Sequence, residues 1–523
     1  MYRHSRREFL EDVGRGMLVA SLGSATALEL GLTPALADEP TPRLTFGNLE
    51  PLVSLMQETP PDRLLPILVE RLQGGTDLKA LVTAAALANA RAFGGQDYTG
   101  FHTFMALLPA YQMSGELPPE RRALPVLKVL YRNSSRIHEQ SAHHDDTLHA
   151  IQAAEIAGQG PEGERLRESV RAVDWDGAEA HFAALTKGPV GEAFNHLQFA
   201  VRDEVDVHRT VLAWRAWAML DLTGGEYAHT LLRQSVRYCL DVEQKMRDKN
   251  HDRSGVRQVL PRLLDQYHLA GKSLGDRQAD DGWIEQTART IAFGTRDEAA
   301  EAVADALAQG MSSESVGEAI SVAANLLVLH DPGRREQYST EQKPPGCVHG
   351  DSVGVHASDA ANAWRNIARV SNPQNQIASL IVGAYHTAGH DVLITKDPYP
   401  YAELLEKTDA TDAKTLLGQA EEAIKGNDQA RASAVVHRYG ELKLPERPVF
   451  DLLLNYAVSE DGALHAEKYY RTVCEEFAST RPSLRWRQLI ALARVTASEH
   501  GYPAPGYQEA TELLGVGSTT AGV

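Results

Sequence analysis

The chain has 523 residues, and its 52 lysine and arginine residues against 70 aspartate and glutamate residues give a formal charge of −18 at pH 7. Hydrophobic residues at 43% and charged residues at 23% are typical of a globular protein, which excludes a mostly disordered chain, a collagen and a polytopic membrane protein. The acidic balance argues against nucleic acid as a partner, because nucleic-acid binding needs a basic surface.

The N-terminus carries the features of an export signal. Residues 5–10 read Ser-Arg-Arg-Glu-Phe-Leu, a weakly apolar stretch follows at 16–32, and small residues at 34–37 precede Asp38. This segment resembles a twin-arginine signal peptide. The apolar stretch contains Glu29 and is too polar and too short for a stable membrane span. We therefore expect the twin-arginine export machinery to deliver the protein to the periplasm or the outside, with residues 1–37 removed.

The resemblance to that route also implies how the cargo travels. Twin-arginine substrates cross the membrane already folded, often because a metal or cofactor is loaded inside the cell. A bound metal or cofactor is therefore a reasonable expectation for this chain.

After a linker at 38–48, apolar residues recur at helical spacing almost throughout. We expect an all-α fold of packed antiparallel helix pairs, solenoid-like or toroid-like, with no significant sheet. The longest polar, Pro- and Gly-bearing stretch is 331–355, and loops of that length are uncommon inside compact domains. The predicted organisation is an N-terminal helical domain at 49–330, a long loop at 331–355, a C-terminal helical region at 356–515 and a tail at 516–523.

Several familiar motifs are absent or lack their context. Cys239, Cys347 and Cys474 are an odd number and widely spaced, so they predict neither a disulfide framework nor a thiolate metal site, although one pair remains able to bridge. His386 and His390 lie one helical turn apart, but no glutamate separates them as in zinc proteases, and Gly389 indicates that the helix is ending.

Histidine is the residue type that stands out. Four stretches, at 100–103, 202–209, 347–359 and 459–471, each place a histidine at a predicted helix start beside apolar or aromatic residues. These histidines are His102, His208, His356 and His465, and a similar segment at 227–229 adds His229. An unpaired buried polar group costs about 1–3 kcal/mol, so buried imidazoles need partners. A hydrogen-bonded core histidine is the simplest interpretation of any one of them, and a shared metal or ligand is the interpretation that joins them.

The same stretches carry a resemblance to known proteins. The segments at 100–102, 227–229, 355–363 and 460–470, with the helix of His208, resemble a family of exported bacterial proteins without an assigned activity, and this resemblance covers most of the mature chain. More distantly, the helices headed by His102, His208 and His356 resemble the questin oxidase family. That family implies an all-helical monooxygenase acting on aromatic polyketides.

These observations lead to one main hypothesis, an exported, oxygenase-like oxidoreductase with an internal histidine-lined pocket. The imidazoles expected to converge, and to bind a transition metal (iron, copper or zinc) or act on a small-molecule organic substrate, are those of His102, His208, His229, His356 and His465. Lys468 and Tyr469 are candidates for proton transfer. Glu204 and Asp461, each four residues before a histidine, are expected to orient His208 and His465.

Two alternatives belong to other classes. A hydrolase or lyase acting on an extracellular polymer predicts an open cleft with exposed tryptophans, for which the candidates are Trp214, Trp217, Trp364 and Trp486. A non-enzymatic helical scaffold or binding protein predicts that the five histidines are scattered. The distances between the imidazoles separate these hypotheses.

Overall fold

The computed structural model describes residues 43–140, 146–156, 160–350, 352–390 and 392–517. The predicted signal peptide at 1–37 lies outside the described residues, as do the first part of the linker and the last six residues. The chain divides into two units, Met1–Thr45 and Phe46–Val523, and every helix described below belongs to the second.

The all-α prediction is confirmed. The first half of the unit contains α3 (Glu50–Glu58), α4 (Pro61–Gln73), α5 (Leu78–Phe93), α6 (Tyr98–Ser114), α7 (Leu124–Glu139), α8 (Glu162–Ala172), α9 (Trp175–Leu185), α10 (Val190–Val201), α11 (Val207–Ala218), α12 (Leu220–Thr223), α13 (Ala228–Asp248) and α14 (Val256–Gln266). The second half contains α15 (Asp281–Phe293), α16 (Arg296–Ala308), α17 (Ser313–Leu329), α18 (Val353–Val370), α19 (Pro373–Thr387), α20 (Ala402–Glu406), α21 (Ala413–Lys425), α22 (Gln429–Glu441), α23 (Arg447–Ser459), α24 (His465–Ser479), α25 (Trp486–Glu499) and α26 (Tyr507–Leu514). Among the described residues, extended pairing is limited to isolated bridges such as Gly275 with Ser312.

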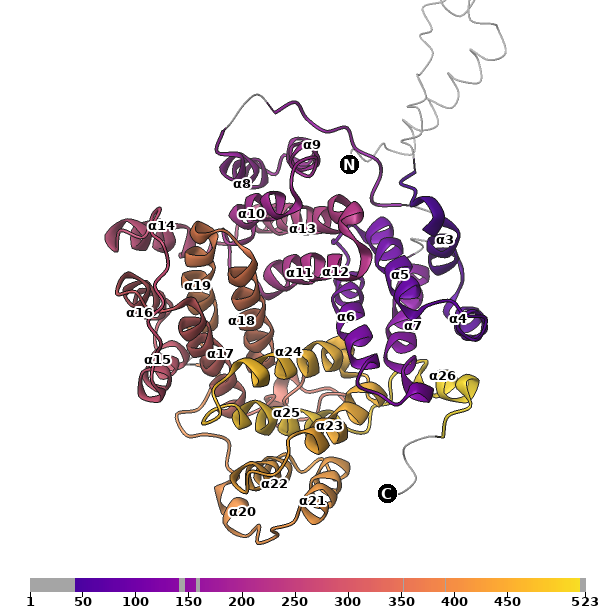
Figure 1. Ribbon diagram of the computed structural model, residues 1–523, viewed down its shortest axis with the longest axis vertical. Coiled ribbons are helices and arrows are strands. Elements are labelled where there is room, and N and C mark those ends of the chain that lie inside the picture. Colours follow the sequence, from indigo (N-terminus) through magenta and orange to yellow (C-terminus); the bar gives the residue numbers. More distant parts are fainter. Residues whose placement is uncertain (1–42, 141–145, 157–159, 351, 391, 518–523) are drawn as a thin grey trace, which may run out of the picture. The chain divides into compact units, whose positions relative to one another are not determined.

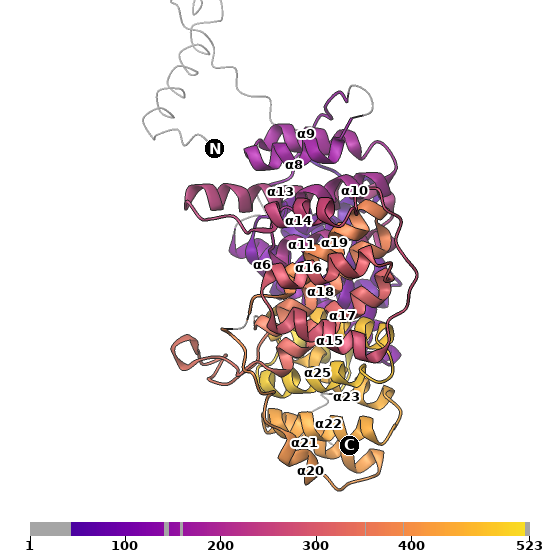
Figure 2. The ribbon, with the colours of Figure 1, turned by 90° about the vertical axis from the view of Figure 1, so that its left-hand side faces the viewer.

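Four helices form the centre of this unit. α6 packs against α11, α11 against α18, α18 against α24, and α24 against α6, which closes a cycle (Figure 1). Further helices surround the cycle: α5 and α7 contact α6, α17 and α19 contact α18, and α25 contacts α24. In both ribbon views α8 and α9 lie at one end of the unit and α20, α21 and α22 at the other (Figure 2).

Side-chain caps fix where three of the central helices begin. The Asp97 carboxylate accepts the backbone N–H of Gly100 at 2.7 Å ahead of α6, and Asp206 accepts that of Arg209 at 2.8 Å ahead of α11. Ser352 caps α18, so this helix begins inside the stretch that the sequence analysis assigned to a loop. Caps of this kind satisfy backbone donors that have no partner within the helix.

Two negative observations apply to the described residues. None of their helices combines the length and the apolar composition that crossing a bilayer requires. Cys239, Cys347 and Cys474, all within the described residues, form no disulfide with one another, so the pairing that the sequence left open is not made.

Candidate functional site

Four of the five predicted histidines meet at the centre of the helix cycle. The ring centroids of His102 and His208 lie 4.7 Å apart, and those of His102 and His465 lie 5.1 Å apart. His356 completes the ring, at 5.7 Å from His208 and 5.2 Å from His465. We call these four residues the histidine tetrad. Each imidazole touches two others, so the tetrad is a closed cycle that repeats the packing order of the four helices.

Each tetrad histidine lies at or near the start of its helix. His465 is the first residue of α24, His208 the second of α11, His356 the fourth of α18 and His102 the fifth of α6. The N-terminus of a helix carries a partial positive charge of roughly half an electron, from backbone N–H groups without helical partners. Four such ends meet here, which disfavours imidazolium ions and favours negative charge on a bound group.

Hydrogen bonds define the tautomers of three tetrad members. The Nδ1–H of His102 donates to the carbonyl of Tyr98 at 2.7 Å, and that of His465 donates to the carbonyl of Ala463 at 3.1 Å, so both Nε2 atoms carry a lone pair. The Nε2 atoms of His356 and His465 lie 3.2 Å apart, which makes His356 the donor in that pair. Within the described part of the chain, the buried Nε2 atoms of His102 and His208 have no hydrogen-bond partner.

Burial keeps these imidazoles neutral. His102 and His465 are only 2% and 3% exposed, and loss of solvation lowers the pKa of both far below the usual value for histidine. The same cause lowers the pKa of His208 to about 4, against the opposing charge of Asp206. At neutral pH the tetrad therefore consists of uncharged imidazoles, each with one N–H donor and one lone-pair acceptor.

A buried lysine lies beside the tetrad. Lys468, in the first turn of α24, is 2% exposed, and its positive charge lowers the pKa of His102, His208 and His465. Burial lowers the pKa of Lys468 itself to about 8, with Asp359 acting in the opposite direction. The carboxylates of Asp359 and Glu467 favour its charged form, so a positive charge is held beside the tetrad.

His465 is held by a strained turn. Gly462, Ala463 and Leu464 all have positive φ angles, of 48°, 46° and 66°, and the last two are not glycines. Side chains at such angles cost free energy, and residues of this kind concentrate at functional sites. The buried Lys128 ammonium braces this region from α7, with hydrogen bonds to the carbonyls of Ala457 and Glu460 at 2.9 and 2.7 Å.

Glycine 350 packs directly on the same imidazole. A Cβ atom at Gly350 would lie 2.2 Å from the Cβ atom and 2.4 Å from the Cγ atom of His465, which is far inside van der Waals contact. The Gly350 N–H donates to the carboxylate of Glu499 at 2.7 Å. The backbone of the loop before α18 thus forms one wall of the site.

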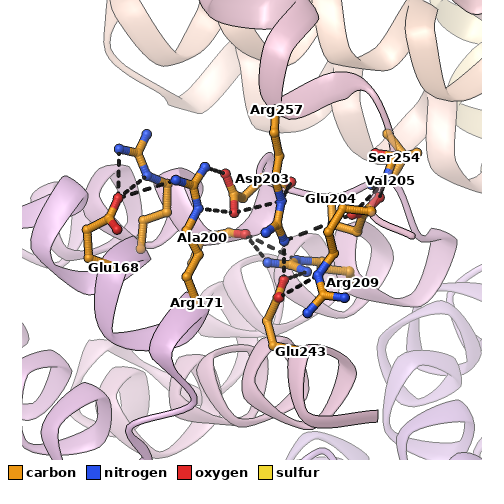
Figure 3. A network of polar contacts seen from close by, with 12 residues as sticks. Glu168, Arg171, Ala200, Asp203, Glu204, Val205, Arg209, Glu243, Ser254 and Arg257 are labelled. Carbon is orange, nitrogen blue, oxygen red and sulfur yellow. Dashed lines mark hydrogen bonds and ion pairs between the residues drawn. The ribbon is translucent and has the colours of Figure 1, made fainter. Parts of the chain in front are cut away.

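A buried ionic network fixes the turn before His208 (Figure 3). The Arg209 guanidinium donates to the carbonyl of Ala200 and to the Glu243 carboxylate, and Glu243 also pairs with Arg257. Asp203, at the end of α10, receives hydrogen bonds from Arg171. This network ties α8, α10, α13 and α14 to the first turn of α11 and so sets the position of His208.

Aromatic and histidine side chains line the edges of the tetrad. The ring of Tyr98 lies 4.4 Å from that of His102 and 5.6 Å from that of His208, and Tyr98 is 58% exposed, so it connects the tetrad to the surface. His386 accepts a hydrogen bond at Nδ1 from the indole of Trp364, and burial lowers its pKa to about 4. The charge of His208 makes a small contribution to that shift.

The structure does not bring every predicted residue together. His229 makes no ring contact or hydrogen bond to the tetrad in the described part of the chain, and its ring lies 6.3 Å from that of Phe182 instead. Tyr469 is buried and contributes to the wall of a cavity beside His465. Neither predicted carboxylate orients its histidine: Glu204 accepts the backbone N–H groups of Val205 and Ser254, and Asp461 lies 3.5 Å from Arg132.

The predicted metal site and the predicted open cleft receive no support from the geometry. Among the described residues, no group of three or more His, Cys, Asp or Glu side chains is arranged to hold a metal ion. The four tryptophans expected to line a cleft are all buried or half-buried. The scattering that a scaffold predicts is also not found for the four tetrad members.

The fold and the site define an all-α protein with a buried histidine tetrad where four helix N-termini meet. Comparisons of this chain with protein-family models, with curated proteins and with solved structures each found no match.

Proposed function

We propose that the protein is an enzyme with the histidine tetrad as its active site, and that it is an oxidoreductase of the oxygenase type. The observation that carries the proposal is the closed cycle of four imidazoles, drawn from residues 102, 208, 356 and 465. The resemblance of three of these helix starts to the questin oxidase family favours oxygenase chemistry, and the rest of the argument comes from the site itself.

A structural role explains the tetrad poorly. A core histidine is normally satisfied by a carboxylate or backbone partner, whereas Nε2 of His102 and Nε2 of His208 are buried without one. Each unsatisfied atom of this kind costs about 1–3 kcal/mol, and burial of the Lys468 ammonium beside them adds a desolvation cost. Residues with strongly shifted pKa values that gather in this way are typical of active sites.

The arrangement suits removal of a proton from a weakly acidic substrate. Nε2 of His102 is a lone-pair acceptor, and a substrate anion that forms beside it raises its pKa, so this imidazole can take the proton of a substrate R–H. The Lys468 ammonium and the four helix N-termini then stabilise the anion R⁻. Dioxygen, the oxidant, accepts the electron pair and forms a C–O bond, and return of the proton from the imidazole gives R–O–OH. The balance is R–H + O₂ → R–O–OH.

The proposed reaction uses no metal, because the described His, Cys, Asp and Glu side chains are not arranged to hold one and the Lys468 cation lies beside the tetrad.

The N-terminal residues support a location for the reaction outside the cytoplasm. The twin-arginine pattern at 5–10 supports export of the folded enzyme to the periplasm or beyond.

The decisive experiment uses the purified mature protein. Oxygen uptake is measured with an electrode against a panel of acidic C–H compounds such as anthrones and β-diketones, and metal content is measured on the same sample. We expect uptake that falls at least 100-fold in His102→Gln and is unchanged in His251→Gln, a substitution at an exposed histidine.

Two results would count against the proposal. Uptake that is equal in His102→Gln and in the parent protein would remove the tetrad as the active site. A metal bound in stoichiometric amount and lost in His102→Gln would replace the proposed chemistry with a metal-dependent one.

A further inference from the structure

A narrow cavity lies against His465. It is bounded by α23, α24, α25, the start of α18 and the loop before it. The lining residues are Gly350, Val355, Tyr456, Ala457, Glu460, His465, Ala466, Tyr469, Leu492, Val495, Thr496 and Glu499. Its empty volume, counted with the part open to solvent, is about 380 Å³. Its inner space admits water at only about one or two positions.

Part of the cavity lining is aliphatic. Val355, Leu492 and Val495 are at most 4% exposed, and they line the cavity together with the methyl groups of Ala457 and Ala466. Water gains little in such a space because few hydrogen-bond partners are present, whereas a small apolar molecule loses no hydrogen bonds on entry.

The polar groups of the lining are mostly engaged elsewhere. Glu460 accepts the backbone N–H groups of Gly501 and Tyr502 at 3.0 and 2.8 Å, and Glu499 accepts that of Gly350. Tyr469 is 2% exposed, and its hydroxyl has no well-formed hydrogen bond, although Ser358 is close to it. Thr496, 8% exposed, also lines the cavity, which therefore combines aliphatic walls with buried hydroxyl-bearing side chains.

We propose that this cavity holds dioxygen next to His465, with the Tyr469 hydroxyl as hydrogen-bond donor to it. The inner space has room for about one small molecule, its aliphatic lining favours an apolar one, and His465 belongs both to the cavity wall and to the tetrad. The assignment of dioxygen as a substrate rests on the proposed oxygenase function, but occupation of the cavity by the gas does not.

The test uses dioxygen itself and needs no turnover. Protein with labelled methyl groups is equilibrated with oxygen at raised pressure, and the paramagnetic relaxation of each methyl resonance is measured by NMR. We expect relaxation of the Val355, Leu492 and Val495 methyl groups to increase at least threefold more than that of Leu231 and Val236, which are equally buried in α13. Equal enhancement at both sets would overturn the proposal.

Two variants check that the cavity is responsible. Val495→Phe fills the space and should abolish the excess relaxation at Val355, while Val370→Phe, on the exposed end of α18, should leave it unchanged. Ala457→Leu fills the cavity from α23 and serves if Val495→Phe fails to fold. Excess relaxation that persists in a folded filling variant would overturn the assignment.

The same measurements separate this inference from the proposed function. Excess relaxation at the cavity in a protein without tetrad-dependent oxygen uptake would support the gas site and contradict the proposed function. Tetrad-dependent uptake without excess relaxation would contradict the gas site alone.

Discussion

The Nε2 atoms of His356 and His465 lie 3.2 Å apart, although 109 positions separate the two residues in the chain. One imidazole must donate and the other must accept at this distance. Because the Nδ1–H of His465 is held by the carbonyl of Ala463, His465 is the acceptor, and a proton on its Nε2 would break the pair. The hydrogen bond between these two imidazoles therefore requires His465 to be neutral.

Acid should destabilise the protein through its buried imidazoles. The pKa of His208 and that of His386 are each lowered to about 4 in the folded state. As pH falls below about 6.5, these two imidazoles bind protons in the unfolded chain but not in the folded chain. The free energy of unfolding therefore decreases between pH 6.5 and 4. The loss is at most about 3 kcal/mol for each imidazole. Urea denaturation at pH 7.5 and 5 measures it.

A matched pair of variants isolates the site. His208→Gln should show a smaller decrease between the two pH values, and His251→Gln, at an exposed position, should behave as the parent protein does. An identical pH dependence in all three proteins would show that His208 titrates normally in the folded state.

Removal of the buried ammonium should change stability in the alkaline range. The pKa of Lys468 is lowered to about 8 in the folded state. Between pH 8 and 10.5 the unfolded chain keeps a proton that the folded chain has lost, so this group makes the free energy of unfolding rise with pH by up to about 3 kcal/mol. Lys468→Met should lack that rise and be more stable than the parent protein at pH 7, as judged from urea midpoints.

An exposed lysine supplies the comparison. Lys245→Met removes a side chain that is 59% exposed and should leave the alkaline rise intact. If Lys468→Met and Lys245→Met share the pH dependence of the parent protein, the Lys468 ammonium is solvated rather than buried.

A single methyl group on the loop before α18 should displace His465. Gly350→Ala places a Cβ atom against that imidazole, and overpacking of this kind costs about 1–3 kcal/mol. We expect a shift of the His465 ring resonances in ¹⁵N NMR spectra and at least a tenfold loss of any tetrad-dependent activity. Gly418→Ala, in α21, meets no atom within 4 Å and should be neutral or slightly stabilising. Unchanged His465 resonances in Gly350→Ala would mean that the two groups are not in contact.

The contribution of Lys128, in α7, to stability should depend on its ion pair with Glu467. Lys128 and Glu467 form an ion pair at 2.7 Å with side chains 1% and 0% exposed. Lys128→Met leaves the carboxylate buried and unpaired, which costs about 3–5 kcal/mol. Adding Glu467→Gln should recover part of that loss, and a double-mutant cycle measures the recovery. Strictly additive effects would show that the pair is not coupled.

The sequence was sufficient to predict the fold class and the convergence of four of the five histidines. Helical spacing of apolar residues after the linker predicted an all-α fold, and the described residues fold into helices without a sheet. The rule that joined His102, His208, His356 and His465 was a histidine at a helix start beside inward-facing residues. His229 satisfies the same rule, and its contact with Phe182 shows that the rule does not determine which way a helix start faces.

Other features of the site could not be predicted from the sequence. Glu204 and Asp461 have the helical spacing of orienting residues, but the backbone N–H groups of Val205 and Ser254 compete for the first and Arg132 lies near the second. Nothing in the local sequence distinguishes Lys128 from other lysines of helical segments. Its hydrogen bonds are made to carbonyls that lie more than three hundred residues away in the chain. Left-handed angles at Ala463 and Leu464 run against residue preference and follow only from the surrounding packing.

The order in which the tetrad is assembled has a consequence for biosynthesis. Its last member, His465, opens α24, which contacts both α6 and α18. The chain is synthesised from its N-terminus, so its earlier helices can fold during translation. The side of α6 that packs against α24 stays uncovered until nearly nine-tenths of the polypeptide has been translated. Premature termination anywhere before that point yields a product with an apolar gap at its centre, a natural target for chaperones and proteases.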